Sequence, residues 1–282
     1  MGYEKLMPKK RQSWSIGLGG SLESDYFSSS INGSYSWASK DGNRQISLSG
    51  QAFFDTWVVI FPEELRVPGL AQVPTDKRRS YNLSLTWAQV INPRLQIALA
   101  GDLVWQEGLL STPFHRVFFR GVNQARIEKL PERRIKVPVS IRANYFLSDF
   151  IVLRSFYRFY YDEFEIMAHS VSLEVPIKLS NSFSIYPHYR YHTQTAASWF
   201  APFAEHLESD QYYSSDYDLS AFDSHNYGIG LRYAPTYGLS RFRMNSKGRL
   251  GIFESIDLRY SRYQRSDGLE AFSIGLDFGF RI

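Results

Sequence analysis

The sequence predicts an all-β protein: an antiparallel transmembrane β-barrel of about 12 strands, forming a single domain over residues 1–282. Three observations predict it: long segments of alternating apolar and polar residues, aromatic residues near the segment ends, and connections that alternate between long and short. Alternation with a period of two is typical of a strand with one wet and one dry face. About 10 tilted residues cross a bilayer core, whereas strands of globular proteins average about 5 or 6.

Residues 166–195 show this pattern most fully. Odd positions are apolar or aromatic, and the even positions between them are mostly polar or charged. Ser180, Asn181 and Ser182 separate the two halves, and such residues favour a tight reversal because they hydrogen-bond their own backbone. We therefore expect a β-hairpin. Its dry face consists of Val171, Leu173, Val175, Ile177, Leu179, Phe183, Ile185, Tyr189 and Tyr191.

A soluble antiparallel sandwich or barrel is the alternative interpretation of such a hairpin. Two features favour a membrane instead. The apolar side chains give way to Tyr189 and Tyr191 near a strand end, where transmembrane barrels carry an aromatic belt. The opposite face carries Glu174, His188 and Arg190, as a polar lumen does.

Composition supports this fold class and excludes others. Aromatic residues make up 16% of the chain, no run of about 18 apolar residues exists, and cysteine is absent. Thiolate metal sites, disulfides and cysteine nucleophiles are therefore excluded. Residues 1–11 lack an apolar signal-peptide core and are expected to be an N-terminal periplasmic segment. The net charge of +4 is scattered, so no nucleic-acid partner is expected.

The same alternation test, applied along the whole chain, locates 12 strands. They are expected near residues 12–22, 26–37, 44–56, 80–91, 95–106, 135–147, 151–161, 166–179, 183–195, 226–233, 251–263 and 270–282. Long connections at 58–77, 107–134 and 196–224 alternate with mostly short ones, as in outer-membrane barrels with long outer loops and short periplasmic turns. The connection at 234–250 is long for a periplasmic turn and fits this alternation least well.

The last strand and the prolines add two specific expectations. Gly275, Phe278 and Phe280 resemble the C-terminal assembly signal of bacterial outer-membrane barrels, although Arg281 and Ile282 follow them. An ordinary amphipathic strand is the alternative. Pro176 and Pro187 face each other approximately across the hairpin, and proline donates no ladder hydrogen bond, so one shared defect in the ladder is expected there.

Several segments together resemble a bacterial outer-membrane barrel family known only as a domain of unknown function. They are residues 22–26 (LESDY), 106–108 (QEG) with 113–117 (PFHRV), 160–162 (YYD) with 168–170 (AHS), 189–191 (YRY) with 194–197 (QTAA), and 215–217 (SDY) with 219–220 (LS). The resemblance covers most of the chain from about Leu22 onward. Members usually carry further strands before this region, which implies that the chain is the later part of a larger barrel. The resemblance implies a fold and a location but no activity.

The sequence predicts no catalytic or metal-binding motif. His169 and Ser170 are adjacent, so on a strand they point to opposite faces and cannot form a nucleophile–base pair. His188 and His192 share a face but are about 13 Å apart, too far for one metal ion. No phosphate-binding loop or zinc spacing occurs. We therefore expect no enzyme, no cofactor and no metal, with a barrel lipid hydrolase as the least favoured alternative.

The lumen-facing positions are mixed in charge but mainly basic. A pore or substrate-selective channel with a mildly basic lumen is the favoured function, and a structural or secretion-linked barrel that scaffolds a partner is the alternative. The wall around Arg154 and Arg158 is expected to favour small anions, since arginine rows do so. Internal salt bridges that only fill the barrel are the competing interpretation. The predicted lumen residues are Arg142, Arg154, Arg158, Glu174, His188, Arg190, Arg232 and Arg259.

The second long connection is rich in apolar residues, including Leu110, Phe114 and Phe118. These side chains are too apolar to lie in water over so short a span, so a constriction loop inside the barrel is expected. Packing across the barrel mouth against the other long loops is the alternative. Expected partners are outer-membrane lipids, the barrel assembly machinery, and either small anionic solutes or a periplasmic or lipoprotein partner. The expected location is the outer membrane of a Gram-negative envelope.

Overall fold

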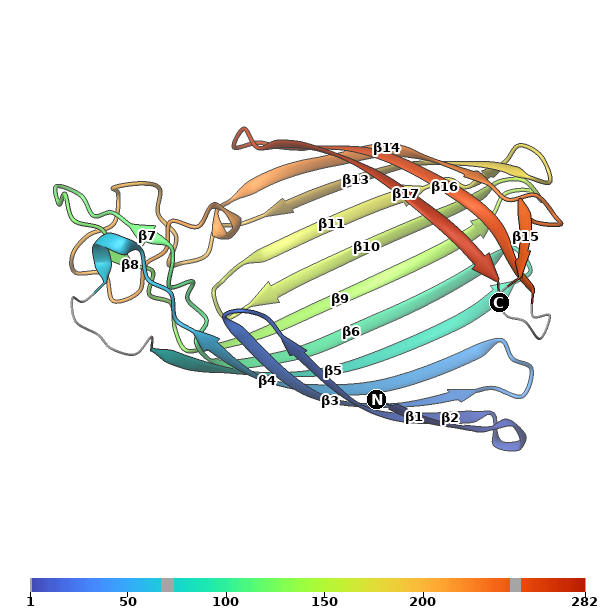
Figure 1. Cartoon of the computed structure of the whole chain (residues 1–282), viewed down its shortest axis with the longest axis horizontal. Coiled ribbons are helices and arrows are strands. Elements are labelled where there is room, and N and C mark those ends of the chain that lie inside the picture. Colours follow the sequence, from blue (N-terminus) through green and yellow to red (C-terminus); the bar gives the residue numbers. More distant parts are fainter. Residues whose placement is uncertain (1, 67–73, 244–249, 282) are drawn as a thin grey trace.

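A computed structural model describes residues 2–66, 74–243 and 250–281, and most of them form one strongly curved antiparallel sheet (Figure 1). Parts of the expected connections 58–77 and 234–250, and the terminal Ile282, lie outside the described residues. The strands are β1 (Gly2–Met7), β2 (Gln12–Leu22), β3 (Tyr26–Ala38), β4 (Arg44–Val58), β5 (Thr75–Asn92), β6 (Leu95–Gly108), β7 (Arg116–Val117), β8 (Arg126–Ile127), β9 (Arg133–Phe146), β10 (Val152–Asp162), β11 (Met167–Glu174), β12 (Ile177–Lys178), β13 (Phe183–Gln194), β14 (Phe222–Tyr233), β15 (Ser240–Arg243), β16 (Leu250–Arg265) and β17 (Glu270–Arg281).

The helical elements are short 3-10 turns at η1 (Pro8–Lys10), η2 (Glu63–Leu65) and η3 (Tyr217–Leu219). In the described part of the chain no helix is long and apolar enough to cross a membrane.

Each long strand pairs with its neighbour in sequence, so the sheet is an up-and-down meander from β1 to β17. Strands β14 and β15 lie end to end along one edge of β16, and β17 occupies the other edge. The small hairpin of β7 and β8 forms a separate sheet beyond the strand ends (Figure 1). Connections between the long strands of a meander run along the sheet ends, which leaves both faces free.

The expected barrel of about 12 strands needs correction in two respects. All 12 expected segments form strands, but the described residues contain 17 strands, because β1, β7, β8 and β15 are additional and the segment at 166–179 is divided into β11 and β12. Residues 2–7, expected as part of a periplasmic segment, form β1 and pair with β2. The sheet is also not closed, since no pairing joins β1 or β2 to β17 within residues 2–66, 74–243 and 250–281.

The predicted turn residues act through their side chains. Asp41 Oδ1 accepts a hydrogen bond from the Asn43 backbone N–H at 3.2 Å, and the intervening glycine takes a φ of +74°. Asn92 Oδ1 accepts from the Arg94 N–H at 2.9 Å. Ser180 Oγ accepts from the N–H groups of residues 182 and 183 at 3.2 and 3.1 Å. These bonds replace ladder partners where the chain reverses.

The shared proline defect is confirmed. Strand β11 ends at Glu174, β12 begins at Ile177, and Pro187 lies in β13 opposite this break. The register is the same on both sides, because Glu174 pairs with His188 and Ile177 pairs with Ile185. Two prolines that cannot donate thus share one interruption, and the faces of the sheet are preserved through it.

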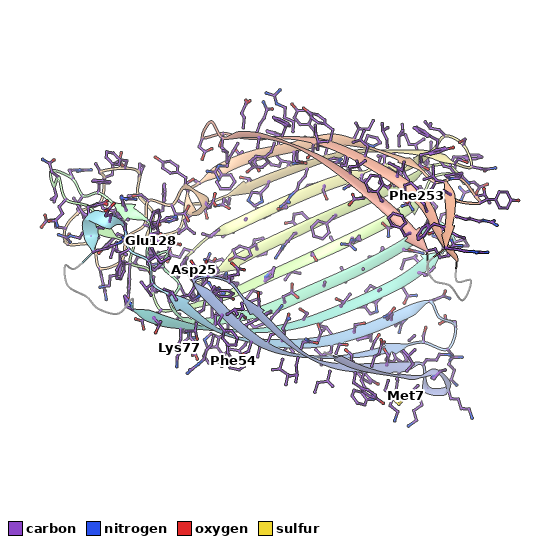
Figure 2. All side chains as sticks on the ribbon, in the orientation of Figure 1. Met7, Asp25, Phe54, Lys77, Glu128 and Phe253 are labelled. Carbon is purple, nitrogen blue, oxygen red and sulfur yellow. The ribbon has the colours of Figure 1, made fainter. Side chains whose placement is uncertain are left out.

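The two faces of the sheet differ sharply in chemistry. Cross-strand partners share a face, and the chain of partners Leu99, Ile141, Tyr157, Val171 and Tyr191 runs apolar or aromatic across five strands. Side chains on this face point outward from the curve (Figure 2). Exposed members include Ile46, Leu48, Leu83, Leu85, Leu99, Leu103, Val139, Ile141, Val171 and Leu173, each 37–54% exposed.

Buried apolar side chains are few and lie mainly at one end of the sheet. A cluster of Leu130, Phe164, Ile166 and Ala197 is packed against Leu110 and Trp199. Arg134 Nε donates to Asp162 Oδ2 at 2.9 Å, and Asp162 Oδ1 accepts from the backbone N–H groups of residues 164 and 166. The protein interior is therefore concentrated where the long connections meet, and the sheet itself is left without a hydrophobic core.

We call this region the loop cluster and define it as residues 59–66, 109–132 and 196–221. Glu64 forms an ion pair with Arg116, and isolated bridges join Lys129 to Tyr213 and Phe119 to His206. All three long connections are thus in contact at one end of the sheet, at the left of Figure 1. The short turns at 38–44, 92–95, 146–152 and 178–183 lie at the other end, whereas those at 22–26, 162–167 and 265–270 lie at the same end as the loop cluster.

Candidate functional site

The eight predicted lumen residues lie on one face of the sheet. Register pairs Arg154 with Glu174 and Glu174 with His188, and positions two apart on a strand share that face. Arg190 pairs with Ser172 and Arg259 pairs with Gly230, so these two arginines lie on the same face. The polar face so defined is opposite the apolar face and carries the charged groups of six strands: β9, β10, β11, β13, β14 and β16.

An ion-pair network crosses the polar face from β10 to β16. Arg154 Nη1 donates to Glu174 Oε1 at 2.9 Å, and Glu174 Oε2 lies 3.6 Å from Arg259 Nη2. Arg232 Nε lies 3.8 Å from Asp257 Oδ1. These groups surround a cavity of about 550 Å³, which Tyr186 and Asp277 also line. The network therefore holds its charges around a hollow that can take water and small solutes.

Glycines on β14 create the room for this network. Glu174 is on β11 and Arg259 on β16, so their contact has to pass over β13 and β14. A Cβ on Gly228 would come within 2.9 Å of the His188 ring and 2.0 Å of the Tyr260 carbonyl oxygen. A Cβ on Gly230 would lie 3.4 Å from Tyr186. Side chains at these two positions would narrow the space that the charged groups span.

Three predicted arginines, Arg142, Arg158 and Arg190, have no carboxylate partner in the described part of the chain. Among the described residues, no Asp or Glu oxygen lies within 4.0 Å of Arg158 or Arg190. His188 lies two residues before Arg190 on β13, and its Nδ1 is buried without a hydrogen-bond partner within the described chain. The polar face is therefore net basic around Arg158 and Arg190, because Glu174 neutralises only Arg154 and Arg259 beside it.

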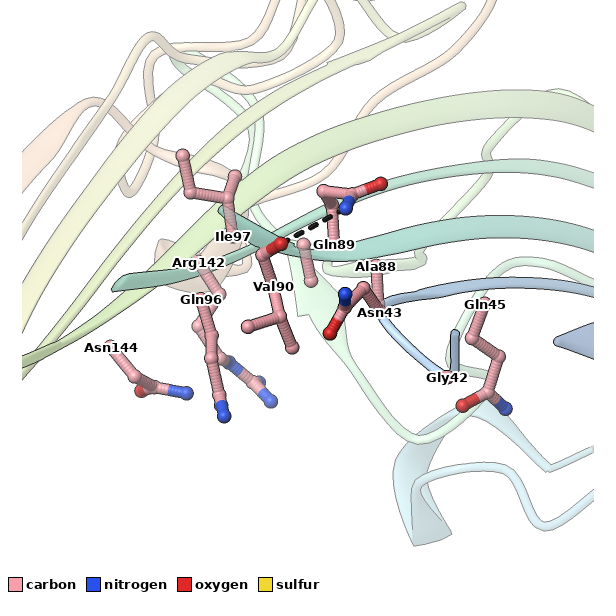
Figure 3. A pocket seen from close by; sticks show the side chains of 11 residues that line it. Gly42, Asn43, Gln45, Ala88, Gln89, Val90, Gln96, Ile97, Arg142 and Asn144 are labelled. Atoms are coloured by element: carbon pink, nitrogen blue, oxygen red, sulfur yellow. Dashed lines mark hydrogen bonds between the residues drawn. The ribbon is translucent and has the colours of Figure 1, made fainter. Parts of the chain in front are cut away.

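Arg142 lies near the short turns, at a second cavity of about 280 Å³ (Figure 3). Its guanidinium carbon is 5.7 Å from the centre of the Phe156 ring, and Asn144 and Gln96 lie beside it. The Gln89 amide donates to the Val90 carbonyl at 2.9 Å, as the dashed line in Figure 3 shows. Arg142 thus adds positive charge at the end of the sheet opposite to the loop cluster.

The N-terminal strands give the polar face a neutral lining. The predicted lumen residues do not include this part of the face. A cavity of about 400 Å³ is bounded by β2, β3, β4 and β5. Its lining is uncharged: Ser15, Asn32, Gly33, Ser34, Ser49, Gly50, Gln51, Asn82 and Ser84. Serine, asparagine and glutamine occupy every second position of these strands, with Gly33 and Gly50 between them. This alternation can be read from the sequence.

The expected constriction-loop residues lie in the loop cluster, beyond the strand ends (Figure 1). Phe118 packs on Phe203 with ring centres 4.9 Å apart, and Leu110 packs against the buried cluster around Phe164. Phe114 is 53% exposed. The structure therefore places these side chains in the second of the two expected arrangements, against the other long loops and not inside the curve of the sheet.

A serine–histidine pair that the sequence did not predict joins β11 and β13. Ser170 and His192 are cross-strand partners on β11 and β13, and Ser170 Oγ is 2.7 Å from His192 Nδ1. Gln194 Nε2 donates to the carbonyls of residues 218 and 220, so its Oε1 faces His192 Nε2 at 3.2 Å. His192 thus carries its proton on Nε2, and Nδ1 accepts from the Ser170 hydroxyl.

This chain of groups has the order nucleophile, base and orienting group that covalent catalysis requires. Ser170 is only 6% exposed, however, and none of the cavities described above has Ser170 in its lining. His169, on the apolar face, instead bonds to Tyr157 at 2.9 Å. We infer that the Ser170–His192–Gln194 chain braces β11 and β13 against the loop that contains η3.

The residues of the expected assembly signal lie on β17, at one edge of the sheet. Phe280 stacks on Phe253 with ring centres 5.0 Å apart, and Phe278 lies 5.8 Å from the same ring. Gly275 pairs with Arg259 of β16. The two phenylalanines are more than half exposed on the apolar face, and their role in assembly stays a prediction.

These features define a class of protein: a curved, up-and-down antiparallel sheet of barrel type, with an apolar outer face and a hollowed polar face. The chain belongs to the family described as "Protein of unknown function (DUF3570)", whose model matches residues 4–240. No curated protein matches the chain.

Among solved structures, the chain is similar to the siderophore receptor PirA from Acinetobacter baumannii, with a TM-score of 0.55 and 9% sequence identity. The match covers 97% of this chain and 48% of that receptor, so the chain spans about half the receptor's length. At this identity the likeness shows the fold and does not extend to a ligand.

Proposed function

We propose that the protein is an integral β-barrel of the bacterial outer membrane and that its polar face lines a pathway for small solutes. One observation carries the proposal: the sheet exposes its large apolar side chains on one face and has cavities among polar and charged groups on the other. Exposed apolar surface of this extent is costly in water and favourable in lipid. The similarity to a receptor barrel supports the same interpretation at the level of fold.

A bilayer also requires that the free edges of the sheet find partners. Unpaired N–H and C=O groups in hydrocarbon cost several kcal/mol each, so spanning sheets close on themselves. In the described chain the outer edges of β1 and β17 have no strand partner. In the membrane these two edges need strand partners, which each other or further strands of a larger barrel would supply. We propose the exposed phenylalanines of β17 as the surface that the barrel assembly machinery recognises.

The charge distribution favours anionic solutes. Arg158 and Arg190 have no carboxylate within 4.0 Å in the described chain, whereas Glu174 is shared between Arg154 and Arg259. The charged part of the lumen is thus net positive, and arginine binds carboxylates and phosphates well. Small anions or acidic sugars are the proposed solutes. We further propose that the protein has no catalytic activity and needs no cofactor.

A scaffold barrel is the second candidate, and the Arg154–Glu174–Arg259 network favours it, because linked charges also brace a narrow barrel. Such a barrel would bind a periplasmic or lipoprotein partner. Single-channel recording in planar bilayers distinguishes the two functions. Stepwise conductance by protein that shows heat-modifiable migration supports the pore. Folded, membrane-inserted protein without conductance contradicts the pore and supports the scaffold.

A further inference from the structure

Three side chains with metal-ligand chemistry converge in the loop cluster, away from the polar face. They are His115, Glu128 and Asp216, and one ligand atom from each lies within 4.8 Å of the other two. His115 Nδ1 is 3.8 Å from Glu128 Oε1 and 4.0 Å from Asp216 Oδ2. Asp216 lies far from the other two in the sequence, so the packing of two different loops creates the cluster. Figure 2 shows Glu128 within this end of the molecule.

The local structure fixes each of the three side chains. His115 closes a turn through its N–H to the Thr112 carbonyl at 2.9 Å, and the Glu128 N–H donates to the His115 carbonyl at 3.1 Å. The two residues therefore extend the β7–β8 pairing by one position. Asp216 is held from the other loop, since its N–H donates to Ser214 Oγ and its Oδ1 accepts from the Asp218 N–H. Oδ2 is left to face His115.

Glu128 is the central group, and its side chain is only 2% exposed. Its Oε2 accepts from the Thr112 N–H, and its Oε1 accepts from Ser214 Oγ. Within the described residues, no lysine or arginine nitrogen lies within 4.0 Å of Glu128 or Asp216. Two carboxylates, one of them buried, thus share a site in which His115 is the only basic side chain, and burial of a charge without compensation is costly.

His115 offers a free ligand atom to this site. Its Nδ1 is buried and has no hydrogen-bond partner within the described chain. The rest of the ring is accessible, because the side chain is 43% exposed, and Asp216 is 30% exposed. A buried, unpartnered imidazole nitrogen that points at two carboxylates is the arrangement that a bound cation would complete. The exposed sides provide the entry path.

We propose that His115, Glu128 and Asp216 bind one divalent transition-metal cation, with Zn²⁺ as the representative ion. Imidazole and carboxylate ligands bind Zn²⁺ at about 2.0–2.2 Å, so ligand atoms around one ion lie up to about 4 Å apart. The observed separations need only a small contraction. A charge of +2 balances the two carboxylates. Ca²⁺ fits less well, because it prefers six to eight oxygen ligands and no imidazole.

The site would connect the second and third long connections through one ion. Metal binding would then hold the loop cluster closed over that end of the sheet. Ser214 acts as a positioning residue, because its hydroxyl donates to Glu128 and its Oγ accepts from the Asp216 N–H. Loss of such a supporting hydrogen bond typically weakens metal affinity about 10- to 100-fold.

The test is calorimetric titration of the detergent-folded full chain, without a histidine tag, with ZnCl₂ and separately with CaCl₂. We expect one Zn²⁺ per chain and at least tenfold weaker binding of Ca²⁺. Zn²⁺ binding should weaken at least tenfold in each of three variants, Asp216→Asn, His115→Ala and Glu128→Gln. Asp216→Asn disturbs the loop least, since asparagine can still accept from the Asp218 N–H. The control is Glu208→Gln, which alters an exposed glutamate of the same loop cluster.

X-ray absorption at the zinc edge gives a second readout that does not depend on affinity. It should show a nitrogen and oxygen shell with one imidazole, and this signal should be lost in His115→Ala. Heat-modifiable migration shows whether each variant has folded. The proposal is overturned if the folded wild type binds no Zn²⁺ stoichiometrically, or if the three ligand variants bind it as tightly as the control. The second result would indicate adventitious surface binding.

Discussion

Arg154 donates a hydrogen bond at 2.9 Å to Glu174, its cross-strand partner, and Glu174 also lies 3.6 Å from Arg259. The Arg154 side chain is 51% exposed, so the pair contributes only about 0–1 kcal/mol to stability. Its larger effect is on the electric field of the polar face. Glu174 neutralises part of a basic wall, and Arg158 and Arg190 keep the remainder positive.

Replacing Arg154 and Arg158 together by serine should therefore lower the ratio of anion to cation permeability while conductance is retained. The physical reason is the loss of two positive charges from the lumen wall. Reversal potentials across a salt gradient in planar bilayers measure the ratio. A Lys9→Ser, Lys10→Ser variant removes the same charge from η1, outside the polar face, and serves as the control. An unchanged ratio in the arginine variant would mean that these side chains only brace the barrel.

A charge on the apolar face should be far more costly than the same charge on the polar face. Leu85 is 54% exposed on the apolar face of β5, and its neighbour Ser84 lines a cavity on the polar face. Leu85→Arg should lower the free energy of unfolding from lipid vesicles by about 2–4 kcal/mol, whereas Ser84→Arg should change it much less. Denaturant titration in vesicles measures both. Equal effects of the two substitutions would contradict the proposed orientation in the membrane.

The loop cluster should become less stable as pH rises when no metal is added. Burial, the largest cause, raises the pKa of Glu128 above its ordinary value of 4.5, so the folded cluster keeps a proton that the unfolded loops release. The contribution of Glu128 to the stability of the loop cluster is then fully present below pH 4.5 and is lost as pH rises through the folded-state pKa.

Hydrogen exchange of residues 109–132, corrected for intrinsic rates, measures this dependence. Glu128→Gln should flatten it, and Glu208→Gln should leave it unchanged. Protection that increases with pH in the metal-free wild type would show that another group dominates.

Ser170 should not act as a nucleophile, despite its hydrogen bond to His192. Because its side chain is buried under the loop that Gln194 holds, a fluorophosphonate probe should not label it in the folded protein. Mass spectrometry of the probe-treated protein checks this, with Ser170→Ala as the reference. Covalent labelling at Ser170 that disappears in the variant would instead support the lipid-hydrolase alternative.

Much of the fold was predictable because strand faces are encoded locally. Alternation located all 12 long segments, and Ser180, Asn92 and Asp41 marked turns through bonds to nearby backbone groups. The opposed prolines also predicted their shared defect correctly. The additional strands were missed for a physical reason: β1, β7, β8 and β15 are only two to six residues long, so they carry too few alternations to indicate a strand.

The candidate sites also differ in how far local sequence predicts them. Which residues share the polar face follows from local alternation, since a period of two assigns Arg154, Arg158 and Glu174 to one side whatever lies next to them. Which of these groups meet depends on how distant segments pack. The Ser170–His192 pair depends on the register between strands, and the His115–Glu128–Asp216 cluster depends on how two loops pack. Both are contacts between segments distant in the chain, which no local pattern encodes.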